Sequence, residues 1–161
     1  DQPVHRSAVG EINVVQRMHE TDAILGGEGN GGVIVPDLHH GRDALAGTAF
    51  ILQHLAETGA PLSALHDALP HYAMVKDQLP LPEIEADRLL GEMADRTEEG
   101  ELSTIDGLKI DFEDRWVHMR PSNTEPILRV YAEAPTESEA QALADRFKDR
   151  LRGLIDTLDP S

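Results

Sequence analysis

Apolar and polar positions follow two different patterns along the chain, and the change between them lies near residue 80. Before that point, helical spacing over residues 12–19 predicts a helix. The short apolar run Ala23-Ile24-Leu25 predicts a buried strand that enters a glycine-rich loop, and Val33-Ile34-Val35 predicts a second strand. Helices and strands that alternate in this way are typical of an α/β unit.

Two more helices are predicted in this first part of the chain. The side chain of Asp43 can accept hydrogen bonds from backbone N–H groups, so it predicts the N-cap of a helix that ends at Gly59. A shorter helix is predicted to open at Pro61. We expect both helices to turn apolar residues inward: Leu45, Ala49, Leu52 and Ala56 in the first, and Leu62, Leu65 and Leu69 in the second.

The stretch Leu79-Pro80-Leu81-Pro82 predicts a linker, because proline breaks helices and favours extended backbone. We therefore expect one unit over residues 1–80 and a second over residues 81–161.

The second part predicts an α+β unit. Asp106-Gly107 is a hairpin turn signal, and period-two alternation follows it in three stretches: residues 108–112, 116–119 and 128–134. Two helices flank these strands. Their apolar positions are Ala86, Leu89, Leu90 and Met93 in the first, and Ala140, Leu143, Phe147, Leu151, Leu154 and Leu158 in the second. Thr136-Glu137-Ser138-Glu139 has the form of a capping box before the second helix.

Composition narrows the classes of function. The 161 residues include no cysteine, which excludes disulfides, thiolate zinc sites and a cysteine nucleophile. Thirty acidic residues against fourteen basic ones give a formal net charge of −16, which disfavours nucleic-acid binding. No apolar run approaches the roughly 20 residues that span a bilayer. We therefore expect a cytoplasmic protein with neither a nucleic-acid nor a membrane partner.

Two loops carry candidate chemistry. In Gly26–Gly32, Glu28 can accept hydrogen bonds and Asn30 can both donate and accept them, which suits sugar hydroxyls; the alternative is a flexible connection between strands. In Arg120-Pro121-Ser122-Asn123-Thr124-Glu125-Pro126, with Arg129 beyond it, a guanidinium, two hydroxyls and an amide suit a phosphate. The alternative there is a polar hairpin loop in which Arg120 pairs with a neighbouring carboxylate.

No metal site is predicted. The adjacent His39 and His40 point in different directions, and no further ligand cluster accompanies them. We expect Arg42 to fix its loop and Asp43 to cap the helix. The chain has no P-loop, dinucleotide fingerprint or nucleophile elbow.

Both loops are similar to motifs of one family. Gly27-Glu28-Gly29-Asn30-Gly31 resembles the sugar-recognition loop of the α-D-phosphohexomutases, and Arg120–Pro126 resembles their C-terminal phosphate-binding loop. Val9–Asn13 and Gly41-Arg42-Asp43 also look like family segments. The resemblance implies the C-terminal part of a mixed α/β domain 3, followed by a small antiparallel-sheet-plus-helices domain 4.

The resemblance also implies a reaction. Family members move phosphate between C1 and C6 of a hexose through a hexose 1,6-bisphosphate and an enzyme phosphoserine, with Mg²⁺. Their Thr-Ala-Ser-His-Asn-Pro serine loop and Asp-Gly-Asp-x-Asp-Arg metal loop do not occur in this chain.

By resemblance, Glu28 and Asn30 would hold sugar hydroxyls, where many relatives have serine at the second position. Arg120, Ser122, Asn123, Thr124 and, with less support, Arg129 would hold the phosphate that is not transferred.

Two hypotheses follow. The chain is the substrate-binding part of a phosphohexomutase, inactive without the N-terminal domains of the same full-length chain. Alternatively, it is a stand-alone, non-catalytic phosphosugar-binding or regulatory module. The first residue, Asp1, favours the first hypothesis, and an upstream reading frame that encodes the serine and metal loops would support it.

Overall fold

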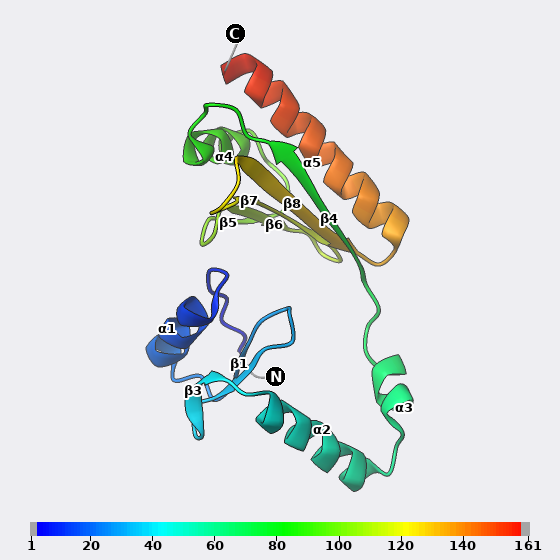
Figure 1. The fold of residues 1–161 in the computed structure, drawn as a ribbon. Helices are drawn as coiled ribbons and strands as arrows, with labels where there is room; N and C mark the ends of the chain where they lie inside the picture. The colour runs from blue at the N-terminus through cyan, green and yellow to red at the C-terminus, as the bar shows by residue number, and fades with distance from the viewer. Residues whose placement is uncertain (1–2, 159–161) are drawn as a thin grey trace. The chain divides into compact units, whose positions relative to one another are not determined.

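The chain divides into two compact units, residues 1–70 and 71–161 (Figure 1). The computed structural model describes residues 3–158. The predicted linker at residues 79–82 is wrong, because Ala73–Pro80 forms β4, the first strand of the second unit. The boundary predicted at residue 80 therefore lies ten residues earlier. Proline is tolerated in an edge strand, because the outer side of such a strand needs no backbone donor. Pro80 is the last residue of β4, which lies at the edge of the sheet.

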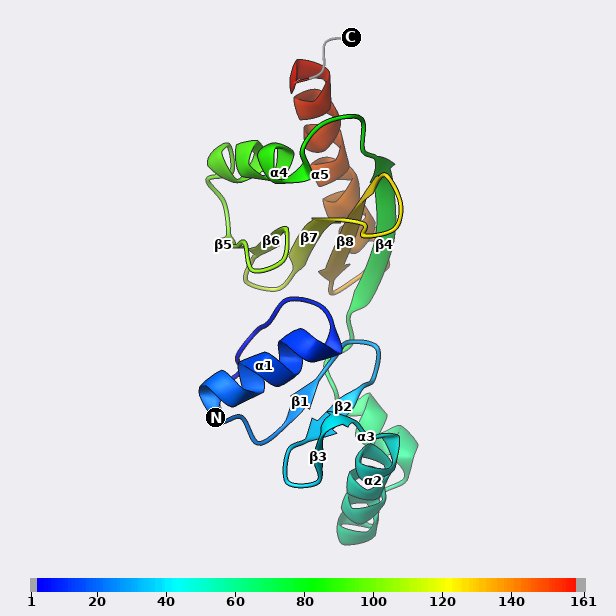
Figure 2. The ribbon, with the colours of Figure 1, turned by 60° about the vertical axis from the view of Figure 1, so that its left-hand side comes forward.

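The first unit is built on a small antiparallel sheet with the strand order β1-β2-β3. Its elements are α1 (Glu11–Thr21), β1 (Gly26–Gly27), β2 (Val33–Val35), β3 (His39–Arg42), α2 (Ala44–Thr58) and α3 (Leu62–Asp67). α1 packs against β1 and β3 (Figure 2). The core consists of Val14 and Met18 from α1 and Ile34 from β2, which confirms the predicted helix and the predicted strand at residues 33–35.

The strand predicted at residues 23–25 is wrong. The strand lies over Gly26–Gly27 instead, and the side chain of Ile24 is 83% exposed. The physical reason is the close approach of α1 to β1: a Cβ atom at Gly26 would overlap the sulfur of Met18. Glycine, rather than the apolar residues before it, is what allows the helix to pack on the backbone there.

The ends of α2 are as predicted. The carboxylate of Asp43 accepts hydrogen bonds from the backbone nitrogens of Leu45 (2.8 Å) and Ala46 (2.9 Å). The Ala46 N–H contributes most to lowering the pKa of the Asp43 carboxyl. At the other end, Gly59 has a φ of 66°, a left-handed conformation that glycine adopts without strain.

The prediction that α2 and α3 turn their apolar residues inward is wrong. Ala46 is the one buried residue of α2, Leu45 is 82% exposed, and α3 has no buried residue. The strand beneath α2 is three residues long, so it has room to cover only a short part of a fifteen-residue helix. Among the residues that the structure describes, the remaining apolar side chains of α2 have no layer to pack against.

The second unit is a five-stranded antiparallel sheet with the order β4-β8-β7-β6-β5. Its elements are β4, α4 (Ala86–Asp95), β5 (Glu101–Ser103), β6 (Leu108–Asp111), β7 (Trp116–Pro121), β8 (Ile127–Ala134) and α5 (Glu137–Leu158). β4 pairs with β8 from Ala73 opposite Ala134 to Pro80 opposite Ile127. An α/β unit followed by an antiparallel sheet with helices is the predicted fold class.

The core of this unit lies between the sheet and its two helices (Figure 1). The predicted alternation is confirmed, since every second residue is buried in β6, in β8 and over Trp116–Met119 of β7. One half of the predicted capping box is formed, since the Glu139 N–H donates to the Thr136 hydroxyl oxygen at 3.3 Å. The Glu139 carboxylate accepts from that hydroxyl at 2.7 Å in place of the backbone N–H of Thr136. The loops at the ends of these strands are therefore attached to a sheet that has one buried face.

Lys148 of α5 is a charged residue in this core, 9% exposed, and its ammonium donates to the carboxylate of Asp77 on β4. Asp145 lies 3.6 Å from the same nitrogen. The Lys148 hydrogen bond is the main cause that lowers the pKa of Asp77. Replacing Asp77 with asparagine should therefore lower the free energy of unfolding of the second unit by about 1–3 kcal/mol at pH 7, because a buried ammonium loses its charged partner.

The pH dependence of this effect has a definite sign. A carboxyl whose pKa is lower in the folded state stabilises the fold above its unfolded pKa of about 4, and the contribution is lost as the pH falls through the folded value. Urea denaturation of both proteins should show a gap at pH 7 that narrows below pH 4. Asp149→Asn is the matched control, because Asp149 pairs with Arg152 on the exposed face of α5. Equal gaps for Asp77→Asn at both pH values would contradict the assignment.

Candidate functional site

The glycine-rich segment after β1 closes into a tight loop through its own backbone. The N–H of Glu28 donates to the carbonyl oxygen of Gly32 at 3.1 Å, and the N–H of Gly31 donates to the carbonyl oxygen of Glu28 at 3.0 Å. Gly31 has a φ of 91°, a conformation that residues with a Cβ atom rarely adopt. The loop is therefore a defined turn, not the flexible connection that was the alternative.

Glu28 and Asn30 have different environments within this loop. The Asn30 carboxamide oxygen accepts from the N–H of Gly32 at 3.0 Å, which leaves its amide nitrogen as a donor for a ligand. The Glu28 side chain is 14% exposed, and its Oε2 lies 4.0 Å from Nη1 of Arg42. One residue thus presents donors and the other presents acceptors, the pair that a sugar hydroxyl needs.

Arg42 fixes its loop, as predicted, through a partner that sequence reasoning missed. Its Nε donates to Oε2 of Glu11 at 2.7 Å, and its backbone N–H donates to Oε1 at 3.2 Å. These two bonds, the backbone one foremost, lower the pKa of the Glu11 carboxyl. No local pattern could have predicted the pair, because the two residues are 31 positions apart. Neighbouring His39 contacts Asp43, whereas His40 stacks on His19.

The second loop joins β7 to β8 and begins at Arg120, near the end of β7. The Arg120 side chain is 19% exposed, and its Nη1 lies 3.9 Å from Oδ2 of Asp106. That distance is beyond a hydrogen bond. Within the part of the chain that the structure describes, the guanidinium of Arg120 makes no hydrogen bond. The alternative in which a carboxylate saturates Arg120 is thus present only as a long ion pair.

The register of the hairpin brings a second guanidinium beside the first, since Arg120 and Arg129 are directly opposite each other. Arg129 Nη2 donates to the Ser122 hydroxyl oxygen at 3.3 Å, and Nη1 donates to the Tyr131 hydroxyl at 3.2 Å. Its Nε is buried and has no hydrogen-bond partner. A buried donor without a partner costs free energy, so this site favours a further acceptor.

Asn123 and Thr124 lie at the exposed tip of this loop. The backbone N–H of Thr124 is directed at the Ser122 hydroxyl oxygen, 3.5 Å away. The base of the loop is closed by the Ser122 N–H, which donates to the Ile127 carbonyl oxygen at 2.9 Å. Tyr131 is the residue here that sequence reasoning missed, although period-two alternation from Arg129 places it on the same face of β8.

The two candidate loops were also compared with the ligand preferences of Mg²⁺. Mg²⁺ prefers carboxylate and water oxygens in an octahedral arrangement. Within either unit taken alone, the described residues bring no three histidine, aspartate or glutamate side chains close enough to share an ion. The residues of the two candidate loops therefore offer no such group, and no chemical step is assigned to a metal.

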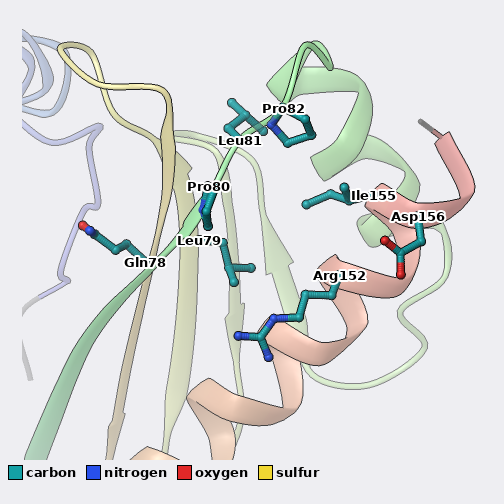
Figure 3. Close-up of a pocket in the computed structure, with 8 residues that line it drawn as sticks. All are labelled: Gln78, Leu79, Pro80, Leu81, Pro82, Arg152, Ile155 and Asp156. Carbon is teal, nitrogen blue, oxygen red and sulfur yellow. The ribbon is translucent and has the colours of Figure 1, made fainter. Parts of the chain in front are cut away.

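A separate open pocket of about 420 Å³ lies between the end of β4 and the last turns of α5 (Figure 3). Its lining is mostly apolar and consists of Gln78, Leu79, Pro80, Leu81, Pro82, Arg152, Ile155 and Asp156. None of the predicted site residues belongs to it, and its lining lacks the convergent donors of the Arg120 loop. We therefore place the candidate chemistry at the two loops.

No helix in the described range, residues 3–158, has the length and apolarity needed to cross a bilayer.

Comparison with known proteins gives the same division of the chain. A family model described as phosphoglucomutase/phosphomannomutase, alpha/beta/alpha domain III, matches residues 1–72. A second, described as the C-terminal domain of the same family, matches residues 74–150. Together the two models cover almost the whole chain and meet close to the boundary between the structural units.

Curated relatives and a solved structure are similar over nearly all of the chain but much longer. A probable phosphoglucosamine mutase of Methanopyrus kandleri is 34% identical over 95% of this chain and 34% of its own length. A phosphoglucomutase/phosphomannomutase of Thermococcus kodakarensis is 39% identical over 86% of this chain and 30% of its own length. The crystal structure of a phosphoglucomutase/phosphomannomutase family protein from Burkholderia thailandensis matches with a TM-score of 0.72 and 30% identity. The match covers 96% of this chain and 32% of that one. The chain thus spans about a third of the length of these relatives.

Proposed function

Because the chain belongs to the phosphoglucomutase/phosphomannomutase family across both of its units, we propose that it is the substrate-binding C-terminal portion of a phosphohexomutase. The full-length protein would interconvert a hexose 1-phosphate and a hexose 6-phosphate through a hexose 1,6-bisphosphate. The serine and metal motifs of the family do not occur in these 161 residues. In this proposal the N-terminal domains of the same chain supply the phosphoserine and Mg²⁺, and the present chain alone is inactive.

The observation that carries the proposal is the set of unsatisfied donors at the Arg120 loop. Arg120 makes no hydrogen bond within the described residues, and the buried Nε of Arg129 has no partner. Guanidinium groups bind phosphate through parallel charge-assisted hydrogen bonds, and the hydroxyls of Ser122 and Thr124 and the N–H groups of Asn123 add further donors. A phosphate is the ligand whose oxygens would satisfy this set.

The glycine-rich loop supports recognition of the hexose itself. Glu28 and the amide nitrogen of Asn30 offer an acceptor and a donor, which suit hydroxyl groups but not an anion. Hydroxyls would be recognised by the first unit and phosphate by the second, while the chemistry takes place elsewhere. Neither loop then depends on which end of a bisphosphorylated sugar is being transferred. The phosphate held by the Arg120 loop would position the other end of the sugar for transfer.

A titration of the isotope-labelled 161-residue chain with glucose 6-phosphate, followed at the backbone amides, tests this proposal. We expect shifts at Ser122, Asn123 and Thr124 with glucose 6-phosphate and with inorganic phosphate, and shifts at the Gly27–Gly32 loop only with ligands that contain the sugar. Glucose without phosphate is the control for the Arg120 loop, and mannose and glucosamine phosphates test the preferred hexose.

A turnover assay with glucose 1-phosphate and mannose 1-phosphate tests the remaining part of the proposal. The purified chain should give no product, since it lacks the serine that carries the phosphate. Turnover above the buffer blank would contradict the assignment as an inactive portion. Unchanged amides at Ser122–Thr124 during the titration would contradict the assignment as a phosphate-binding unit.

A further inference from the structure

Glu28 lies in a segment that has little means of its own to hold a side chain in place. Five of the seven residues from Gly26 to Gly32 are glycines, yet the Glu28 side chain is largely buried. Within the described residues its carboxylate makes no hydrogen bond, and its one ion pair is with Arg42. We propose that Arg42, braced by Glu11, is a positioning residue that fixes the carboxylate of Glu28 for hydroxyl recognition; this inference rests on the proposed role of Glu28.

The path of the Arg42 side chain explains how it reaches the loop. Arg42 is the last residue of β3, and its aliphatic stem passes directly over the backbone of Gly32. A Cβ atom at Gly32 would lie 2.6 Å from Cδ and 3.2 Å from Cγ of Arg42. The first distance is shorter than real Cβ atoms show and the second is tight, so glycine at position 32 lets the stem lie against the loop without moving and bring its guanidinium toward Glu28.

Glu11 determines which nitrogen of the guanidinium faces the loop. Its two carboxylate oxygens are occupied by the backbone N–H and the Nε of the same residue, Arg42, at 3.2 Å and 2.7 Å. These bonds lower the pKa of Glu11, so it is an anion at neutral pH. With Nε held in this way, Nη1 is the nitrogen that lies 4.0 Å from Glu28 Oε2.

The arrangement has a chemical consequence for ligand binding. At 4.0 Å the guanidinium attracts the Glu28 carboxylate without a hydrogen bond to it, so the carboxylate oxygens stay available as acceptors for a sugar hydroxyl. Without Arg42, Glu28 would lose the one cation that lies within ion-pair distance of it among the described residues, and its side chain would be free to turn away. An isolated exposed ion pair contributes little to stability, so the main effect of Arg42 should appear in binding and not in folding.

The test compares glucose 6-phosphate binding, measured at the amides of the Gly27–Gly32 loop, between the 161-residue chain and its variants. Glu28→Gln should weaken binding about tenfold, through loss of a charged acceptor. Arg42→Gln should weaken it roughly fivefold, about 1 kcal/mol. Arg17→Gln is the matched control, because Arg17 pairs with Glu20 on α1 of the same unit, and it should bind as the wild type does.

A charge swap separates positioning from a merely structural tie between α1 and β3. The double variant Glu11→Arg with Arg42→Glu restores an ion pair between the two elements but places an anion beside Glu28. We expect it to recover the stability of the first unit and to leave binding at least as weak as in Arg42→Gln. Where Arg42→Gln does not fold, as judged from the amide spectrum of α1, Arg42→Lys replaces it with weaker binding again expected.

The outcomes distinguish the inference from the function on which it rests. Wild-type binding by Glu28→Gln would overturn the proposed role of Glu28 and the inference with it. Weakened binding by Glu28→Gln together with wild-type binding by Arg42→Gln would overturn only the inference. Recovery of binding by the charge swap would also overturn it, because Arg42 would then act only as a tie.

Discussion

Replacing Arg120 with alanine should weaken the binding of glucose 6-phosphate to this chain by about 2–3 kcal/mol, a loss of roughly 30- to 150-fold. Arg120 is the guanidinium at the loop whose donors are unsatisfied within the described residues, apart from the 3.9 Å ion pair with Asp106. A phosphate held there would gain charge-assisted hydrogen bonds that alanine cannot supply. Isothermal titration of the wild type and the variant measures the difference directly.

Two further variants control this experiment. Arg115→Ala removes an arginine from the turn between β6 and β7, where it lies 3.8 Å from the carboxylate of Asp114, and should leave binding unchanged. Arg120→Lys keeps the charge but loses the planar fork, and should bind with intermediate affinity. Wild-type affinity in Arg120→Ala, with the amide spectrum of the second unit unchanged, would show that the loop holds no phosphate through Arg120.

The largest effect on stability should come from Phe147→Ala. Phe147 lies in the middle of α5 and is fully buried against the sheet. The guanidinium carbons of Arg146 and Arg150 lie over its ring, 4.7 Å and 5.0 Å from the ring centroid. Truncation of a buried phenylalanine removes its transfer free energy and leaves a cavity, which costs about 3–5 kcal/mol. That loss is a large part of the roughly 5–15 kcal/mol that stabilises a typical protein.

Urea denaturation followed by the fluorescence of Trp116 measures this effect. Trp116 is the one tryptophan of the chain and lies on β7, so its signal reports the second unit. Leu102→Ala on the edge strand β5 is the control, and a change below about 1 kcal/mol is expected there because Leu102 is exposed. A comparably small change for Phe147→Ala would mean that α5 does not complete the core of the second unit.

The second unit could be predicted from its sequence more fully than the first. Leu128, Val130, Ala132 and Ala134 alternate with polar residues because one face of β8 is buried and the other is not, and such a pattern identifies a strand without further information. In the first unit, the apolar pattern of α2 indicates that the helix has something to cover, but not where the covering layer comes from. The last two residues of β4, Leu79 and Pro80, were assigned to a linker because Pro80 and Pro82 favour extended backbone and break helices.

The candidate site divides in the same way. The donors of Arg120–Pro126 are visible in the sequence because they are consecutive, and Arg129 follows on the adjoining strand; that they bind phosphate stays a prediction. The supports of the site could not be predicted. Glu11 reaches Arg42 only when α1 packs on β3, and Tyr131 contacts Arg129 only because both lie on one face of β8. Contacts of this kind depend on tertiary structure, and no single local pattern contains them.

The placement of β4 bears on the kinetics of folding. It is the first strand of the second unit to be synthesised, yet among the described strands it pairs with β8 alone, with α4, β5, β6 and β7 between them in the sequence. Strands β5 to β8 can pair in succession as local hairpins, whereas β4 must close a long loop whose entropy cost precedes any contact. During translation β4 therefore stays unpaired until β8 has been synthesised. In this interval its unpaired edge leaves the nascent chain open to aggregation.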